Sequence, residues 1–326
     1  MSPNKKRNVV PPEQFLRLPE YSNGTPSPIV DTHSHLLSTF ASYRSLYPDG
    51  QYEDVFDFMR GMYDGKGVES MVDVWCEAPV QKEWKELADS ALSEELRKEK
   101  WNGIEYWFVM GEHAASVHQA KDYNDTVEAD ILEAMRHPRC VGWGEIGLDY
   151  HYDNSPRDIQ RQVFTRQLEN AVKLGKPLTI HTREAEEDTE RILKETVPKD
   201  HKIHVHCFTD SADFADRLLD WFPNLYIGIT GVITYATNQS TSEVIRRLSA
   251  KSKDTPLRIL LETDAPYMVP GNLYKALPTL KGRLPICHTA MIPWTAEFVA
   301  GVAGEGFDTE RVLKEARENA RRMYGV

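Results

Sequence analysis

Two histidines separated by one residue stand in the segment Asp31-Thr32-His33-Ser34-His35, at the end of a short apolar run. Side chains two positions apart on a strand point to the same side, so both imidazoles can reach one metal ion. A single histidine is more often a packed or surface residue, whereas an HxH pair at a strand end favours a metal site. We therefore take His33 and His35 as the first part of a candidate metal centre.

Two carboxylates follow other apolar runs in the same manner. Glu145 lies in the segment Gly144-Glu145-Ile146-Gly147, and Asp264 lies in Glu262-Thr263-Asp264-Ala265-Pro266. A carboxylate in such a place can be a salt-bridged residue or a neighbour of a helix N-cap. It is also the group that a pair of metal ions needs as a bridge. Glu262 alternates with Asp264 and can face the same interior.

Two further segments add histidines. His181 lies in Thr179-Ile180-His181-Thr182-Arg183, and His206 lies in His204-Val205-His206-Cys207-Phe208. His206 is nearer the end of its run and is the better ligand, while His204 is better interpreted as a packed or supporting residue. Together, four histidines and two carboxylates suit a pair of divalent ions with nitrogen and oxygen ligands and open positions for water.

Eight short apolar runs, which alternate with amphipathic segments, must position these residues. Several are apolar on both faces, as is typical of buried parallel strands. The runs are Pro28–Asp31, Val68–Cys76, Tyr106–Met110, Val141–Gly147, Leu178–Ile180, Ile203–Val205, Leu225–Thr230 and Leu257–Leu261. The alternation predicts an α/β protein with a parallel sheet, and eight units predict a closed TIM (β/α)8 barrel. All the candidate ligands then meet at the carboxyl ends of the strands.

Helices are predicted between and after these strands. The clearest is Pro156–Gly175, with Asn154 and Ser155 as caps and Gly175 as the stop. Similar patterns predict helices at 212–222, 293–302 and 309–324, the last two outside the barrel. Long loops are expected at 37–67 and 265–294, on the rim where barrel active sites lie.

The N-terminal segment and the composition limit the other possibilities. Six prolines within the first 28 residues predict an extended arm over 1–27, followed by one barrel domain over 28–326. With 40% hydrophobic and 27% charged residues, the 326-residue chain is an ordinary globular protein. It has no membrane-length apolar stretch and no signal-peptide pattern, so we expect a reducing location, cytoplasmic or nuclear. The four cysteines form no CxxC pair, and no phosphate-binding glycine loop or GxSxG elbow is present.

The net charge of −11 excludes one common mode of nucleic-acid binding. Proteins that grip duplex DNA along their length present a basic stripe, and this chain has none. If it acts on nucleic acid, it should do so at a local site where metal ions neutralise the phosphate charge.

Taken in order, several motifs resemble those of the TatD family of metal-dependent hydrolases, which are amidohydrolase-like barrels. They are DTHSHL, GEIGLDY, the stretch ending in TIHTREA, HCF and ETDAPY, from Ile29 to Pro266, with a weaker match at Glu318-Asn319-Ala320. The resemblance implies a TIM barrel with one or two metals and DNase activity of the 3′–5′ exonuclease type. It implies that His33, His35, Glu145 and Asp264 hold the first metal, and that Glu145, His181 and His206 hold the second.

The chain departs from the family pattern in three places. The family's G-x-H-P-H reads Gly111-Glu112-His113-Ala114-Ala115 here, so that His113 matches the first histidine and the second is missing. After HCF an acidic residue, Asp210, stands where a small one is usual. A divergent loop over Tyr274–Trp294 contains Lys275, Lys281 and Arg283, which could supply positive charge or simply be exposed. These changes leave the metal ligands intact and put the substrate in question.

The resulting mechanistic hypothesis is hydrolysis by a metal-activated water. Asp264 would accept the proton of that water, Glu145 would bridge one or two divalent ions, and Arg183 and His113 would contact the phosphate. Arg183 could instead pair with a carboxylate on the rim. Histidine ligands favour Zn²⁺ or Mn²⁺, whereas the family resemblance favours Mg²⁺.

DNA, as single-stranded ends, is the expected substrate, and exposed aromatic side chains beside the metals would favour it through base stacking. Tyr150, Tyr235 and Tyr267 are the candidates. The alternatives are hydrolysis of another ester or amide, such as an aminoacyl ester or a lactone, or a role as a barrel-based interaction protein. No membrane association is expected, and the sequence identifies no protein partner.

Overall fold

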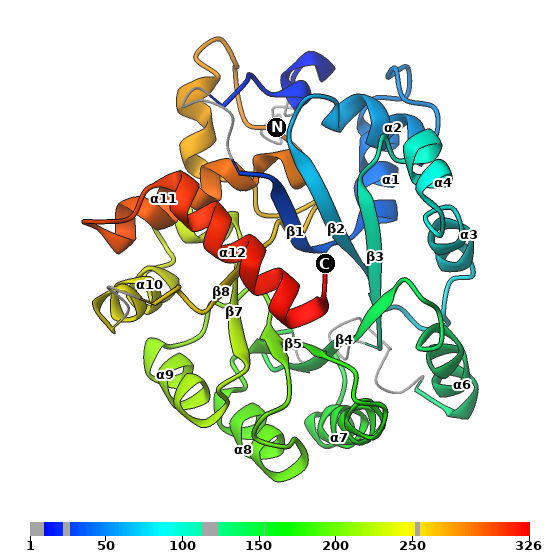
Figure 1. Cartoon of the computed structure of the whole chain (residues 1–326), viewed down its shortest axis with the longest axis vertical. Coiled ribbons are helices and arrows are strands. Elements are labelled where there is room, and N and C mark those ends of the chain that lie inside the picture. Colours follow the sequence, from blue (N-terminus) through cyan, green and yellow to red (C-terminus); the bar gives the residue numbers. More distant parts are fainter. Residues whose placement is uncertain (1–9, 22–26, 113–122, 153, 252–254) are drawn as a thin grey trace, which may run out of the picture.

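The computed structural model describes residues 10–21, 27–112, 123–152, 154–251 and 255–326. Its centre is a ring of eight parallel strands in the order β1 to β8 (Figure 1). A bridge between Ser34 and Ala265 joins the ends of the first and last strands. The strands are β1 (Ile29–Ser34), β2 (Val68–Trp75), β3 (Glu105–Met110), β4 (Cys140–Asp149), β5 (Leu178–Arg183), β6 (Ile203–Val205), β7 (Leu225–Ile229) and β8 (Ile259–Leu261). The predicted TIM barrel is confirmed.

Helices surround this ring. They are α1 (Leu36–Leu46), α2 (Val55–Tyr63), α3 (Glu83–Asp89), α4 (Glu94–Lys100), α6 (Asp125–Ala134), α7 (Arg157–Leu174), α8 (Glu186–Thr196), α9 (Ala212–Trp221), α10 (Ser240–Lys251), α11 (Ile292–Ala303) and α12 (Thr309–Tyr324). Short 3-10 turns are η1 (Glu13–Arg17), η2 (Gly231–Thr234), η3 (Gly271–Ala276) and η4 (Thr289–Met291). No helix of the described residues is both long enough and apolar enough to cross a membrane.

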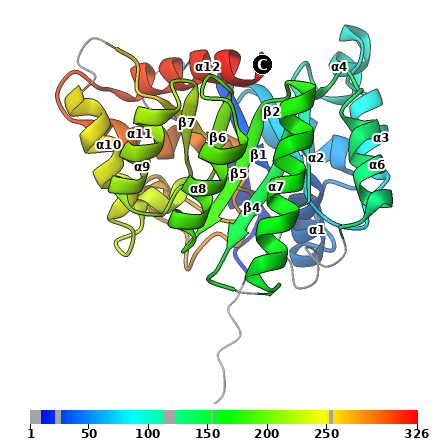
Figure 2. The ribbon, with the colours of Figure 1, turned by 90° about the horizontal axis from the view of Figure 1, so that it is seen from below.

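Helix α12 closes the amino-terminal end of the barrel (Figures 1 and 2). Its Met323 and Tyr324 pack with strand side chains such as Val30, Val72 and Leu260 in a separate apolar cluster. A larger core fills the space between the strands and the surrounding helices. Because α12 and this apolar cluster close the amino-terminal end, an open site is left at the carboxyl end of the barrel. The candidate ligands lie at that end.

Two predictions about local structure are wrong. The expected loop over 37–67 contains α1 and α2. The side chain of Asp54 caps α2, and the helix buries Phe58 and Met62. In addition, neither Asn154 nor Ser155 caps α7, because Pro156 occupies the cap position without a side-chain hydrogen bond. The stop at Gly175 is confirmed, with a left-handed φ of 66°.

The described part of the N-terminal segment, residues 10–21, packs against the barrel body. Leu16 of η1 is fully buried, and its carbonyl accepts a hydrogen bond from Nε2 of His288 at 2.9 Å. The hydroxyl of Tyr47 donates to the carbonyl of Pro11 at 2.9 Å. The division of the chain at residue 27 stays a prediction.

His288 should make the protein less stable in acid. Burial lowers the pKa of its imidazole from 6.5 to about 4, with nearby Lys66 acting in the same direction. Below pH 6.5 the unfolded chain therefore takes up a proton that the folded chain refuses, so stability falls until about pH 4. In His288→Gln we expect the loss of unfolding free energy between pH 7 and pH 4 to be smaller by roughly 3 kcal/mol than in wild type. Chemical denaturation at pH 7 and pH 4 measures it, and parallel profiles for the two proteins would contradict it.

Candidate metal centre

The six predicted ligands lie in or shortly after five strands and meet at the carboxyl end of the barrel. Glu145 lies at their centre. Its Oε1 is 2.9 Å from Nε2 of His206 and 3.0 Å from Nδ1 of His181, and its Oε2 is 3.3 Å from Nε2 of His33. One carboxylate oxygen thus faces each group of histidines, as a bridging ligand requires.

The remaining two residues complete the group around Oε2 of Glu145. Nε2 of His35 lies 3.8 Å from this oxygen and 3.4 Å from Oδ1 of Asp264. Oδ1 of Asp264 also lies 3.8 Å from Nε2 of His33. Two sets of donor atoms, from His33, His35 and Glu145 and from Glu145, His181 and His206, each lie within 4.8 Å of one another.

The chemistry of these donors fits divalent cations. The buried Nε2 of His33 makes no hydrogen bond with any described residue. Burial lowers the pKa of His33 to about 4, so its imidazole is neutral and able to bind a metal. A neutral imidazole nitrogen that faces two carboxylates inside a barrel is stabilised by a cation placed between them.

His35 and His181 are held in their charged form when no cation is present. Burial disfavours the charge of His35, but the hydrogen bond and negative charge of Asp264 outweigh it and raise the pKa to about 9. The pKa of His181 is likewise about 9, because Asp149 and Glu145 outweigh burial. A bound metal must therefore displace protons from these imidazoles.

Strand β4 positions Glu145 through two glycines. Gly144 and Gly147 have φ values of +158° and +153°, which side chains rarely adopt. The pairing of β4 with β5 shifts register between Trp143 and Ile146. This irregularity carries Glu145 into the interior beside His181.

A methyl group at Gly147 should disrupt this arrangement. A Cβ at this position would lie 1.9 Å from the carbonyl oxygen of His181, which is backbone and cannot rotate away. We expect Gly147→Ala to destabilise the protein by several kcal/mol or to displace β5 and weaken metal binding. Thermal unfolding and metal content measure the two effects. Gly175→Ala provides a control, since it has a positive φ but open space around its Cβ. A Gly147→Ala protein with native stability and metal content would contradict the account.

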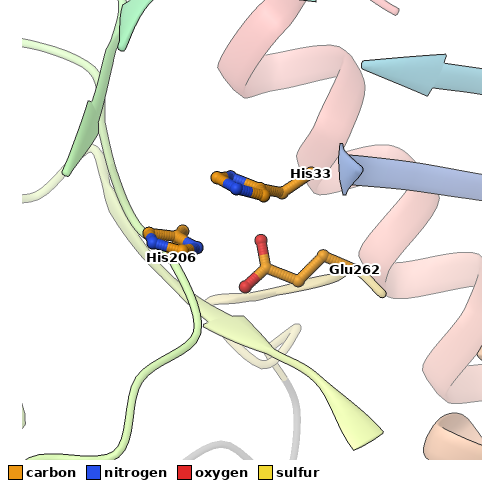
Figure 3. A group of neighbouring side chains, drawn as sticks. All are labelled: His33, His206 and Glu262. Atoms are coloured by element: carbon orange, nitrogen blue, oxygen red, sulfur yellow. The ribbon is translucent and has the colours of Figure 1, made fainter. Parts of the chain in front are cut away.

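Glu262 and His204 lie beneath the ligands. Glu262, which directly follows β8, faces His33 and His206 (Figure 3), and all three are buried. Oε2 of Glu262 lies 2.9 Å from Nε2 of His204, whose Nδ1 is 2.9 Å from the hydroxyl of Tyr324. The structure therefore agrees with the interpretation of His204 as a supporting residue, and it places Glu262 inside the barrel.

Three buried aspartates that the sequence analysis did not single out hold the site together. Asp31 accepts hydrogen bonds from the hydroxyls of Thr263 and Thr289, both at 2.7 Å, which fixes the end of β8 beside β1. Asp73 accepts from the backbone N–H of Leu36 at 2.9 Å, where α1 begins. Oδ2 of Asp149 lies 3.5 Å from Nε2 of His181. For Asp31 and Asp73, the signal that could have found them was an acidic residue within an apolar run.

A cavity of about 600 Å³ lies over the ligands and is open to solvent. Arg183 is the only lysine or arginine among the described residues that line it. No carboxylate of the described chain pairs with its guanidinium, which lies 5.0 Å from the ring centroid of Tyr152. The alternative pairing of Arg183 with a rim carboxylate is therefore not found in the described part.

The other predicted substrate contacts fall in different places. His113 lies outside the described residues. Lys275, Lys281 and Arg283 are exposed but do not line the cavity. Asp210 lies behind the rim, where its Oδ1 accepts a hydrogen bond from the backbone N–H of Glu184 at 3.3 Å, and burial raises its pKa to about 6.

Comparison with known proteins gives consistent matches. The family model described as TatD related DNase matches residues 30–325. The human 3′-5′ RNA nuclease TATDN2 is 35% identical over 301 residues, which cover 91% of this chain but only 35% of that protein. The 3′-5′ ssDNA/RNA exonuclease TatD of Klebsiella pneumoniae is 31% identical over 221 residues, or 68% of this chain and 77% of its own.

Two further matches extend the comparison. The uncharacterized metal-dependent hydrolase YabD of Bacillus subtilis is 32% identical over 225 residues, covering 68% of this chain and 80% of its own. Among solved structures, the TatD homologue YJJV of Escherichia coli superposes with a TM-score of 0.65 at 21% identity, over 91% of this chain and 98% of its own. This likeness supports the fold.

Proposed function

This chain belongs to the TatD family of metal-dependent hydrolases, and on that basis we propose that it is a metal-dependent nuclease that removes nucleotides from the 3′ end of single strands. The observation on which the proposal depends is the position of Glu145, with one oxygen toward His181 and His206 and the other toward His33. This arrangement suits a carboxylate that is shared between two cation sites.

The six ligands would hold one or two divalent ions, with His33, His35, Glu145 and Asp264 around the first and Glu145, His181 and His206 around the second. Bound divalent ions lower the pKa of coordinated water to about 7 and neutralise charge on a phosphate. Donor softness favours Zn²⁺ or Mn²⁺, and Mg²⁺ is the third candidate.

The residues of the chain supply the remaining steps. Asp264 accepts the proton of the attacking water. The oxygen of that water bonds to phosphorus while the bond from phosphorus to the leaving oxygen breaks. Arg183 neutralises a non-bridging phosphate oxygen at the other side of the cavity. Burial acts to raise the pKa of Asp264, but His35 and the other imidazoles outweigh it, so that the carboxylate stays ionised and able to accept a proton.

The assay uses metal-free protein and 5′-labelled oligonucleotides of DNA and RNA, single- and double-stranded, with Mg²⁺, Mn²⁺ or Zn²⁺ added in turn. We expect a ladder of products shortened from the 3′ end, faster on single strands, and none with EDTA. The His33→Ala, His35→Ala double variant is the inactive control. No cleavage with any metal would refute the proposal, and turnover of a lactone or aminoacyl ester under the same conditions would establish the alternative.

A further inference from the structure

Two exposed aromatic side chains stand at opposite sides of the barrel opening. Tyr267 is 61% exposed and follows β8, and Tyr152 is 59% exposed and follows β4. In a ring of eight strands, the fourth and the eighth lie across from each other (Figure 1). The metal ligands lie between them. Tyr267 lines the cavity over the ligands, and the Tyr152 ring lies 5.0 Å from the guanidinium of Arg183, which also lines it.

The three sequence candidates for base stacking can now be separated. The hydroxyl of Tyr150 donates to Oδ2 of Asp188 at 2.7 Å, and the hydroxyl of Tyr235 donates to the carbonyl of Val269 at 3.0 Å. Both rings are partly buried and neither lines the cavity. Of these three tyrosines, only Tyr267 lines it.

Tyr267 is held firmly beside the ligand Asp264. Its backbone N–H donates to the carbonyl of Asp264 at 3.0 Å, and the carbonyl of Pro266 accepts from the N–H of Cys287 at 2.8 Å. Asp264 and Met268 both have left-handed φ values, 52° and 62°, which fix the turn between them. Because the backbone is fixed, Tyr267 has only its side-chain freedom to lose when a ligand binds.

Across the cavity, Tyr152 supports Arg183. The backbone N–H groups of His151 and Tyr152 donate to Oδ1 of Asp149 at 2.8 and 3.0 Å, so the turn after β4 is also fixed. The guanidinium of Arg183 lies over the Tyr152 ring and has no carboxylate partner among the described residues. It is thus a cation available for a phosphate at one side of the metal ligands.

Electrostatics alone is a weak source of affinity here. The chain has a net charge of −11, and Arg183 is the only lysine or arginine in the described lining of the cavity. Binding of single strands by stacking depends little on sequence, since every base has a π face, and requires strands whose bases are unpaired. A duplex end offers no such base without first being opened.

We propose that a single strand crosses the opening from Tyr152 and Arg183 to Tyr267, with a base next to the scissile phosphate stacked on Tyr267 and a phosphate on Arg183. This inference rests on the proposed function and adds to it the residue that selects unpaired bases. Tyr152 acts as a positioning residue, because it orients the guanidinium rather than the reacting atoms.

The test combines removal of the tyrosine ring with removal of the base. Wild type, Tyr267→Ala and Tyr267→Phe are compared on single-stranded oligonucleotides in which one of the last three nucleotides is abasic. We expect Tyr267→Ala to raise KM about tenfold or more on the intact strand, with kcat unchanged, and Tyr267→Phe to behave as wild type. When the abasic site is at the position that stacks on Tyr267, the KM of wild type should rise by the same factor relative to the intact strand. The KM of Tyr267→Ala should not rise further on that strand. Trp221→Ala, an exposed aromatic of α9 outside the cavity, is the matched control.

The inference would be overturned if removal of the Tyr267 ring and removal of the base raised KM independently at all three positions. It would also be overturned if the KM of Tyr267→Ala equalled that of wild type. Either result leaves the nuclease activity of the wild-type protein established. Failure of the proposed function itself would appear differently, as the absence of cleavage of any strand by the wild-type protein. For the other side of the opening, Tyr152→Ala should weaken the salt dependence of KM as Arg183→Gln does, and an unchanged salt dependence would refute the role of Tyr152.

Discussion

Replacing Glu145 with glutamine should reduce kcat for hydrolysis by about 1000-fold or more while leaving a folded barrel. The amide keeps the volume of the side chain but removes the negative charge that faces both histidine groups at 2.9 to 3.3 Å. Loss of a bridging ligand removes several kcal/mol of charge stabilisation, which corresponds to a rate change of this size. Single-turnover kinetics with saturating metal measure the effect, and metal content should fall at both positions.

Glu187→Gln provides the control for Glu145→Gln, since Glu187 is an exposed carboxylate of α8 that does not line the cavity. Circular dichroism and thermal unfolding establish that both variants are folded. Turnover by Glu145→Gln within about tenfold of wild type would show that this carboxylate does not hold the metals together.

Asp264→Asn should reduce kcat by roughly 100- to 10,000-fold, the range that a positioned proton acceptor supplies. Asparagine cannot take the proton of the attacking water. KM should change little, because Asp264 lies on the metal side of the cavity and Arg183 on the other. Steady-state kinetics on a single-stranded oligonucleotide separate the two constants.

A second readout distinguishes this role from a structural one. If Asp264 accepts the proton, Asp264→Asn should bind the metal of the His181 and His206 side with native affinity and still fail to turn over. Loss of both metals together with activity would instead mean that Asp264 only maintains the site. A kcat near that of wild type would exclude either role.

The meeting of the six candidate ligands at one end of the barrel could be predicted from sequence because each stands at or near the end of an apolar run. In a parallel barrel these ends meet, so a local pattern at five places specifies a site in space without knowledge of any long-range contact. The family resemblance adds the division of the ligands between two metals. The part of the site that depends only on the ends of strands could therefore be predicted from the sequence.

Other features depend on tertiary contacts that no local pattern reveals. Helix α1 begins at Leu36, directly after the ligand His35, without a side-chain cap, because the carboxylate of Asp73 from the next strand accepts its first N–H. A buried aspartate thus sets the backbone direction at the start of α1, and it comes from another element.

The most direct test of the account is anomalous X-ray scattering from crystals of the protein loaded with Mn²⁺ or Zn²⁺. The account predicts two peaks, one among His33, His35, Glu145 and Asp264 and the other among Glu145, His181 and His206, with Glu145 touching both. In crystals of the Glu145→Gln variant, at least one of these peaks should disappear. Metal bound elsewhere on the chain, or no peak at this end of the barrel in a protein that still hydrolyses its substrate, would contradict it.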